Sequence, residues 1–400
     1  MKRTRYDGYR SFQYLEAGVD YQSFELASEI GRVPSRRVEV SDAEELRVQR
    51  LLEENVVVSL HDHVTVAPAN VADMPDYRRH GREWTGYEGL SVSGLDCVFD
   101  ALMGGTATIT SRMGWKWDDV IYDLGMRLSD TAHQDFLVRA GTLEDIRDAK
   151  ANGRIAFVPC LETATPIENE LDRLDILYGL GIRSCGIAYS EANALGSGLR
   201  EASDAGLTEL GRLAVRRMNR LGIAIDISHA GDRTSLETIA CSERPVFVTH
   251  AGARGLWNTK RMKPDEILKA CAERNGIIGI SAAAHTTLTE RHPLHSLESV
   301  MEHFEYTAHL VGIEHVAFGP DIFFGDHVGL HRFFAKQFSL AASRGGKTIQ
   351  EVEYVDGIEN PSESFPNIVR WLVRHNYSDG DIGMVIGANV MRTLSEVWPR

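Results

Sequence analysis

The most constraining feature of the sequence is an apolar, β-branched segment that ends in two histidines, Val56-Val57-Val58-Ser59-Leu60-His61-Asp62-His63. Such a segment predicts a buried strand. Because alternate residues of a strand share one face, we expect His61 and His63 to point to the same side and to bind one metal ion together. A single His-x-His can equally belong to an ordinary polar loop, so the prediction depends on what the chain repeats elsewhere.

The chain repeats this construction. His229 and His250 each follow another short apolar run, and two carboxylates, Glu162 and Asp321, follow further runs of the same kind. Either carboxylate, taken alone, could be interpreted as a solvated group or as a helix cap. Together, however, all of these side chains lie at or just beyond the carboxyl end of a predicted strand. This common placement indicates one shared site.

Predicted strands alternate with predicted helices along the chain. The expected strands cover residues 56–63, 155–161, 184–188, 223–228, 245–250, 276–281 and 315–319, and the expected helices cover residues 42–54, 117–128, 142–151, 171–180 and 207–221. This alternation predicts a parallel sheet, and this many units favour a closed (β/α)8 TIM barrel. In a barrel the carboxyl ends of the strands converge on one face, where the histidines and carboxylates would meet.

We expect two parts in the chain. Residues 1–45 are predicted to be an N-terminal extension that packs on the barrel or on a partner subunit, and residues 46–400 a single (β/α)8 catalytic domain. Ser41 and Glu44 have the spacing of a capping box, which marks the first helix. Residues 64–95 contain prolines and many charges, so we expect a long connection that shapes the pocket.

Composition excludes several classes of partner. The formal net charge is -14 and no long basic cluster is present, which argues against a nucleic-acid or membrane-surface partner. No apolar run approaches the roughly 18 residues of a membrane span, and the first residues lack the apolar core of a signal peptide. We therefore expect a cytoplasmic protein. Its five cysteines are scattered, which suits reduced core thiols.

Four histidines and two carboxylates on one face suit two divalent ions, with a carboxylate able to bridge them. We expect zinc, with manganese or iron as alternatives because the same ligands bind all three. Two such ions lower the pKa of a water between them toward about 7 and supply hydroxide for attack, which indicates a hydrolase.

The segments Gly206-Leu207-Thr208-Glu209-Leu210-Gly211-Arg212 and Met218-Asn219-Arg220-Leu221-Gly222-Ile223-Ala224-Ile225-Asp226-Ile227-Ser228-His229 resemble the signature of the membrane (renal) dipeptidase family of the amidohydrolase superfamily. The resemblance extends from about residue 50 to Trp398 and includes Gly387-Ala388-Asn389-Val390-Met391-Arg392, which is similar to the closing helix motif of that family.

The resemblance implies roles for the site residues. His61 and the residue at position 63 would bind the first ion, Glu162 would bridge, and His229 and His250 would bind the second ion. Two further residues have implied roles in catalysis and substrate binding. Asp321 would take a proton from the attacking hydroxide and return it to the leaving nitrogen. Arg261, eleven residues after His250, would bind the substrate carboxylate.

The chain departs from the family pattern at its first metal-ligand motif. His63 stands where family members usually carry aspartate, so the chain is a divergent member with His-x-His in place of His-x-Asp. A neutral ligand leaves the ion pair more positive and its water more acidic. Tyr189 stands where the family has a histidine that steadies the scissile carbonyl oxygen, and its hydroxyl can still donate a hydrogen bond. The segment Asp321-Ile322-Phe323-Phe324-Gly325 also lacks the family's second aspartate.

We therefore expect a dipeptidase-like, metal-dependent hydrolase that cleaves a small amide or peptide bond in a carboxylate-bearing substrate. Asp321 and Tyr189 would be catalytic, and Arg261, Tyr189 and His285 would contact the substrate. His327 and His331, in a glycine-containing loop, are expected to be solvated. The aromatic N-terminal extension favours a homodimer or a higher homo-oligomer.

Two other functions remain open. An amidohydrolase-superfamily enzyme could act on a non-peptide substrate by lactone or cyclic amide hydrolysis, deamination or decarboxylation. A binding or scaffold protein on a decayed barrel would predict lost metal ligands, whereas here no metal ligand is lost without a ligand-type replacement.

Overall fold

The computed structural model describes residues 4–102, 115–337 and 349–398. Its strands are β1 (Val58–Val66), β2 (Cys97–Leu102), β3 (Leu137–Arg139), β4 (Ile155–Leu161), β5 (Ser184–Gly186), β6 (Ala224–Asp226), β7 (Val246–Ala251), β8 (Ile277–Ile280), β9 (Val316–Phe318) and β10 (Phe323–Phe324). All neighbouring strands are parallel, in the order β10-β1-β2-β4-β5-β6-β7-β8-β9, and β3 pairs with the start of β4 off this path.

The sheet closes on itself beside β1. β10 pairs with the edge of β1 that β2 leaves open, and β10 follows β9 after only a few residues. Within that short link, the Asp321 N–H donates to the His61 carbonyl oxygen at 2.9 Å, and the His63 N–H donates to the Ile322 carbonyl oxygen at 2.9 Å. β9 and β10 therefore act as one barrel strand. The predicted (β/α)8 barrel is confirmed.

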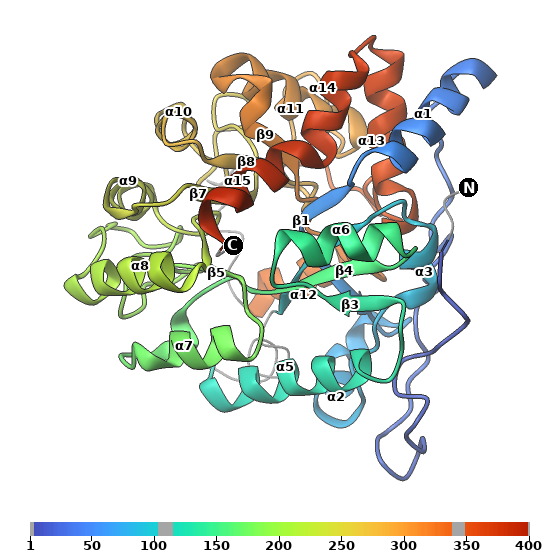
Figure 1. Ribbon diagram of the computed structural model, residues 1–400, viewed down its shortest axis with the longest axis horizontal. Coiled ribbons are helices and arrows are strands. Elements are labelled where there is room, and N and C mark those ends of the chain that lie inside the picture. The colour runs from blue at the N-terminus through green and yellow to red at the C-terminus, as the bar shows by residue number, and fades with distance from the viewer. Residues whose placement is uncertain (1–3, 103–114, 338–348, 399–400) are drawn as a thin grey trace.

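Helices surround the barrel (Figure 1). The α-helices are α1 (Asp42–Glu54), α2 (Met74–His80), α3 (Tyr87–Val92), α5 (Trp117–Thr131), α6 (Leu143–Ala151), α7 (Asp172–Gly179), α8 (Glu209–Leu221), α9 (Asp232–Cys241), α10 (Asp265–Glu273), α11 (Leu297–Val311), α12 (His327–Gln337), α13 (Pro361–Arg374), α14 (Asp379–Gly383) and α15 (Asn389–Val397); shorter turns are η1 (Val71–Asp73), η2 (Thr165–Ile167), η3 (Ile313–His315) and the π-helix η5 (Met384–Ala388). Within the described residues, none of these helices meets the length and apolarity that a membrane span requires.

The five predicted helices all exist, as α1 and α5 to α8. The capping box at the start of α1 is present, since the Glu44 N–H donates to Ser41 Oγ and the Ser41 N–H donates to Glu44 Oε2. The sequence patterns did not predict β2, β3, β10, α2, α3 or the helices α9 to α14, whereas α15 begins in the segment that resembles the family's closing helix motif.

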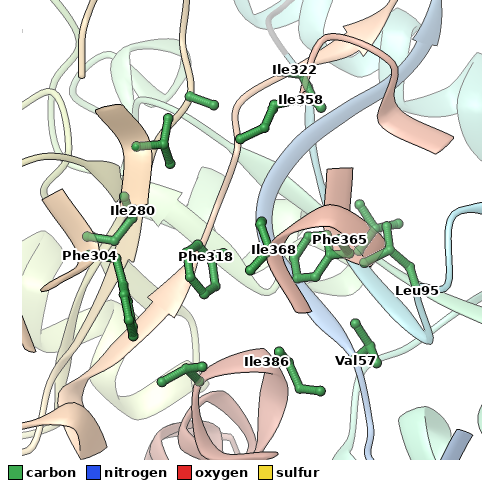
Figure 2. Packing of buried hydrophobic residues seen from close by; sticks show 14 of the residues in the cluster. Val57, Leu95, Ile280, Phe304, Phe318, Ile322, Ile358, Phe365, Ile368 and Ile386 are labelled. Atoms are coloured by element: carbon green, nitrogen blue, oxygen red, sulfur yellow. The ribbon is translucent and has the colours of Figure 1, made fainter. Parts of the chain in front are cut away.

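A buried apolar layer joins the barrel wall to α13 (Figure 2). Ile280 of β8 and Phe318 of β9 lie in one cluster with Phe365 and Ile368 of α13, all of them buried. The Phe318 and Phe365 rings meet edge to face with centroids 6.5 Å apart. This layer fixes the barrel wall from which Asp321 emerges.

The N-terminal arm contacts the barrel of its own chain. Tyr9 Oη and Ser11 Oγ each donate to the buried Asp130 carboxylate of α5 at 2.9 Å. Further along the arm, Arg32 pairs with the buried Glu359 at 2.5 Å. In Figure 1 the dark-blue arm runs along one side of the molecule.

Three sequence expectations were wrong in detail. β1 does not end at His63 but continues to Val66, so both histidines lie within the strand. Residues 64–95 are not a plain connection, since they hold α2 and α3; Pro75 lies in the first turn of α2, where a missing N–H costs no helical hydrogen bond. β6 ends at Asp226, so His229 lies on the loop beyond it.

Candidate metal centre and active site

Glu162 occupies the middle of a buried cluster at the carboxyl ends of the strands. Its Oε1 lies 3.9 Å from His61 Nε2 and 3.8 Å from His63 Nε2. Its Oε2 lies 3.3 Å from His229 Nε2 and 3.9 Å from His250 Nε2. Each carboxylate oxygen therefore faces its own pair of imidazoles, and all of these residues are buried.

The barrel geometry brings these side chains together. His61 and His63, two residues apart in β1, both direct Nε2 toward Glu162 Oε1, as the alternation of a strand predicts. β7 carries His250, and the rings of His61 and His250 stack with centroids 3.5 Å apart. Gly319, at the end of β9, permits this close approach because a Cβ there would overlap the Thr249 carbonyl oxygen.

Hydrogen bonds at Nδ1 of two imidazoles direct Nε2 toward the cluster, where it can act as a metal ligand once it is deprotonated. His63 Nδ1 lies 2.7 Å from the Ala101 carbonyl oxygen, which can only accept, so Nδ1 carries the proton of a neutral ring. Thr249 Oγ1 donates to Asp226 Oδ2 at 2.8 Å and can therefore accept from His250 Nδ1 at 2.8 Å. In the neutral form of each ring the lone pair is on Nε2, which faces the cluster.

The remaining donor set also fits divalent ions. His61 Nε2 and Glu162 Oε1 are buried and make no hydrogen bond to the described residues. Three groups of ligand atoms lie within 4.8 Å of one another: His61, His63 and Glu162; His61, His250 and Asp321; and Glu162, His229 and His250. Imidazole nitrogens and carboxylate oxygens are ligands that zinc, manganese and iron accept.

Burial sets the protonation of the cluster. Desolvation lowers the pKa of His61 to about 3 and holds the pKa values of His229 and His250 well below the usual range, which favours the neutral, ligating rings. Desolvation also lowers the pKa of His63, but the hydrogen bond that its Nε2–H donates to Asp321 and the charge of Glu162 outweigh this effect and raise the pKa to about 9, so without a metal ion the His63 ring is protonated. Desolvation raises the pKa of Glu162 to about 8. A cation among these groups would reverse the shift of Glu162.

Asp321 lies at the same cluster, within 4 Å of three of its histidines. Its Oδ1 is 3.2 Å from His63 Nε2 and 3.5 Å from His61 Nε2, and its Oδ2 is 3.8 Å from His250 Nε2. Burial alone would raise the pKa of Asp321, but His250 and the His63 hydrogen bond hold it well below its usual range. Its backbone has φ +64°, an uncommon conformation for a residue other than glycine, and such strain concentrates at functional sites.

Arg261 and Tyr189 lie beside the same cluster. Arg261 Nη1 donates to the His250 carbonyl oxygen at 3.1 Å, and its Nη2 lies 3.7 Å from Asp321 Oδ2. The Tyr189 ring stacks on the His229 ring with centroids 4.0 Å apart, and burial raises the pKa of its hydroxyl well above the usual range. Tyr189 therefore stays a protonated hydrogen-bond donor.

One pocket, with an empty volume of about 800 Å³, opens on this cluster. It is lined by His63, Glu162, Tyr189, Ser190, Leu199, His229, Thr259, Arg261, Ala284, His285, Thr286, Asp321, Phe323, His327, Leu330 and His331. His285 lines the pocket, as expected from its place after β8, and has φ +61°.

The expectation that His327 and His331 are solvated loop residues was wrong. His327 begins α12 and is 1% exposed, and His331 is half-buried one turn further along the helix. Their rings meet with centroids 4.6 Å apart. The sequence lacked a local signal for this, because the contacts that bury His327 come from Ala284 and Glu359, which are remote along the chain.

Sequence reasoning also missed the residues that support the histidines. Asp226 Oδ1 accepts hydrogen bonds from the N–H and the hydroxyl of Ser228, at 3.0 and 2.6 Å, and shapes the turn that carries His229. Through Thr249 the same carboxylate orients His250. The sequence did contain a pattern that could have identified Asp226. It is an acidic residue at the end of an apolar strand, as Glu162 and Asp321 are acidic residues that follow apolar strands.

The fold and the histidine–carboxylate cluster define a (β/α)8 barrel protein with a candidate metal centre at the carboxyl ends of its strands. The structure is similar to an amidohydrolase from Pseudomonas aeruginosa, with a TM-score of 0.72 and 23% identity over 88% of this chain and 99% of that one. It is also similar to a metallopeptidase from Rhodobacter sphaeroides, solved with a phosphinate mimic of the dipeptide L-Ala-D-Ala, with a TM-score of 0.65 and 19% identity over 86% of this chain and 100% of that one.

The family is defined more narrowly by sequence. The model of the membrane dipeptidase family (peptidase family M19) matches residues 120–330, and the chain belongs to this family. A similar curated relative is dipeptidase aclJ from Aspergillus oryzae, 27% identical over 267 residues, which are 66% of this chain. The match spans only 57% of that relative's own length.

Proposed function

We propose that this protein is a metal-dependent hydrolase of the dipeptidase type, which cleaves a small amide or peptide bond in a substrate that carries a carboxylate. One observation carries the proposal. The two oxygens of the buried Glu162 face two separate pairs of histidine Nε2 atoms, and Asp321 and Arg261 lie at the same cluster. This arrangement supports a two-ion site, a proton carrier and a carboxylate-binding group beside one pocket.

His61 and His63 would hold one divalent ion, His229 and His250 would hold the second, and Glu162 would bridge the two. Zinc is our first choice, with manganese and iron as alternatives. When bound, such ions polarise a scissile carbonyl and acidify water.

Residues of the chain itself would transfer the proton, stabilise the developing charge and bind the substrate. Asp321, held ionised by its neighbours, can accept a proton at the cluster and pass it to the leaving nitrogen. The Tyr189 hydroxyl would donate to the carbonyl oxygen as negative charge develops on it. The guanidinium of Arg261 would bind the substrate carboxylate and so place the scissile bond beside Asp321.

The relatives support a peptide-like substrate. The curated relative is named a dipeptidase, and the Rhodobacter sphaeroides metallopeptidase was solved with a dipeptide mimic. A homodimer or larger homo-oligomer and a cytoplasmic location stay predictions from the sequence alone.

A second candidate is hydrolysis of a lactone or cyclic amide, or a deamination or decarboxylation, on the same barrel. It is favoured by the two departures from the family pattern, His63 at the cluster and Tyr189 stacked on His229. Both change the charge next to the reacting group without removing a ligand or a donor.

A substrate panel separates the two candidates. We expect dipeptides with a free terminal carboxylate to be hydrolysed about tenfold more efficiently than their C-terminally amidated forms, because an Arg–carboxylate contact is lost in the latter. The Arg261→Lys variant should lose most of this preference, since lysine cannot form the bidentate contact. Turnover of lactones or cyclic amides with no dipeptide turnover would overturn the proposal and favour the second candidate.

A further inference from the structure

The pocket carries more hydrogen-bond donors than the proposed reaction uses. His327 Nδ1 and Ser190 Oγ both belong to pocket-lining residues, are buried, and have no hydrogen-bond partner in the described part of the chain. The two side chains are 1% and 0% exposed. Leaving a buried donor unpaired carries a free-energy cost, so such groups call for an explanation.

The proton of His327 can be assigned from its contacts. His327 Nε2 accepts a hydrogen bond from the Ala284 N–H at 3.1 Å, so this nitrogen carries a lone pair. In a neutral imidazole the other nitrogen, Nδ1, then carries the hydrogen. Burial holds the pKa of this ring well below its usual range, so the neutral form prevails. His327, one of the pocket-lining residues, therefore carries one N–H donor that has no partner in the described part of the chain.

The ring of His327 is held firmly. Its backbone N–H donates to Glu359 Oε1 at 3.2 Å, and Glu359 is itself paired with Arg32. The Phe323 ring packs beside it with centroids 5.7 Å apart. A donor fixed at its backbone and at its second nitrogen loses little conformational freedom when it binds a ligand.

The acceptors of a simple dipeptide are already assigned. Its scissile carbonyl oxygen goes to Tyr189 and its terminal carboxylate to Arg261, which leaves the N–H of His327 unmatched. The described pocket lining places no carboxylate outside the metal-ligand cluster that would oppose a further acidic group here. Among the described lining residues the carboxylates are Glu162 and Asp321, and both belong to the metal-ligand cluster. An additional anion at His327 would thus lie among imidazole and hydroxyl groups.

We infer that His327 determines substrate specificity by donating its Nδ1–H to a second carboxylate on the substrate, so that the preferred substrates are dipeptides, or similar small amides, with an acidic side chain. This inference rests on the proposed function and narrows its substrate class. Besides the N–H of His327, the hydroxyl of Ser190 is a further donor among the pocket-lining residues.

Two variants separate a binding role of His327 from a structural one. His327→Gln keeps an acceptor near the position of Nε2 for the Ala284 N–H but loses the donor at Nδ1. His327→Asn places an amide donor near Nδ1 and loses the bond to Ala284. His309→Gln, at an exposed position of α11, is the matched control.

The readout is the ratio of kcat/KM for Ala-Glu over Ala-Met, and for Glu-Ala over Met-Ala, with the metal-loaded enzyme. We expect one of these two ratios to be about ten in the natural protein and in His309→Gln. In His327→Gln the same ratio should approach one, because the KM for the acidic substrate rises. His327→Asn should retain part of the preference. A purely structural His327 predicts the reverse order, with His327→Gln unchanged and His327→Asn impaired on all substrates alike.

Binding without turnover keeps this inference separate from the proposed function. By titration calorimetry, glutarate should bind about tenfold more tightly than butyrate to the natural protein, and His327→Gln should remove that difference. Equal binding of the two acids, or equal turnover of Ala-Glu and Ala-Met and of Glu-Ala and Met-Ala, would overturn the inference and leave the hydrolase proposal standing. No hydrolysis of any dipeptide, with the glutarate preference intact, would overturn the hydrolase proposal instead.

Discussion

His63 Nε2 lies 3.2 Å from Asp321 Oδ1. This contact joins the position at which the chain departs from its family pattern to the carboxylate proposed for proton transfer. Where an aspartate would repel Asp321, the protonated His63 ring of the metal-free site donates Nε2–H to it and helps to hold the pKa of Asp321 low. His63 therefore affects both the charge of the candidate metal site and the readiness of Asp321 to ionise.

An aspartate at position 63, the residue usual in the family, should bind the metal more tightly than a neutral residue of similar shape. In His63→Asp an anionic ligand replaces a neutral one, so we expect the zinc dissociation constant to fall about tenfold relative to His63→Asn, which has a similar shape without the charge. Competition with a fluorescent chelator measures both constants. Equal affinities in the two variants would show that position 63 does not contact an ion.

Asp321→Asn should retain the metal and lose turnover. The amide cannot accept the proton, and general acid–base groups contribute about 10² to 10⁴ in rate. We expect kcat to fall within this range at unchanged metal content. Asp326→Asn, in the loop just beyond, serves as the control because Asp326 lies outside the metal-ligand groups. Full activity of Asp321→Asn would remove this residue from the mechanism.

Asp226 should act through the histidines it positions. Its carboxylate binds Thr249 and Ser228, which orient His250 and the turn before His229. For Asp226→Asn we expect metal affinity to fall about 10- to 100-fold, the usual effect of losing such a support. Asp232→Asn is the control, because that half-exposed side chain pairs with Arg254. Unchanged metal affinity in Asp226→Asn would contradict the positioning role.

Glu359 should make stability depend on pH. Desolvation raises its pKa from about 4.5 to about 7, although Val355 and Arg32 oppose the shift. Between these two values the folded state binds more protons than the unfolded state, so the free energy of unfolding falls as pH rises, by about 3 kcal/mol for this group. Glu359→Gln cannot titrate and should show only a constant offset.

Urea unfolding at pH 5 and at pH 8 measures this effect as the difference between the natural protein and the variant. The natural protein should lose more stability than Glu359→Gln on going to pH 8. Parallel pH dependence of the two proteins would show that Glu359 is ionised in both pH conditions.

Much of the fold was predictable because most of its strands have a local sequence pattern that identifies them. The runs that become β1, β4 and β7 are apolar and β-branched and close on an ionisable residue. β2 escaped prediction because Asp100 interrupts its apolar run. In the structure that carboxylate is buried and pairs with Arg127 of α5 at 3.2 Å, a tertiary contact that no local pattern reveals.

The site residues also fall into two groups, those that a local sequence pattern predicted and those that depend on contacts remote in the sequence. Residues at strand ends, such as Glu162 and Asp321, were found because the barrel brings every strand end to one face. His327 was missed because its burial depends on Ala284 and Glu359, which are distant in the sequence. Thr249 was missed because its role is to orient a neighbour, and that depends on a side-chain hydrogen bond to Asp226.

We propose that Glu162 would bind two divalent ions together with the four histidines. The most direct test is the number of zinc ions bound per chain, measured by elemental analysis after equilibrium dialysis of chelator-treated protein against zinc, with dipeptide hydrolysis followed on the same samples. We predict two ions per chain, turnover that disappears with chelation and returns with zinc, and a lower stoichiometry in Glu162→Gln. One ion or none in the natural protein would contradict the two-ion assignment.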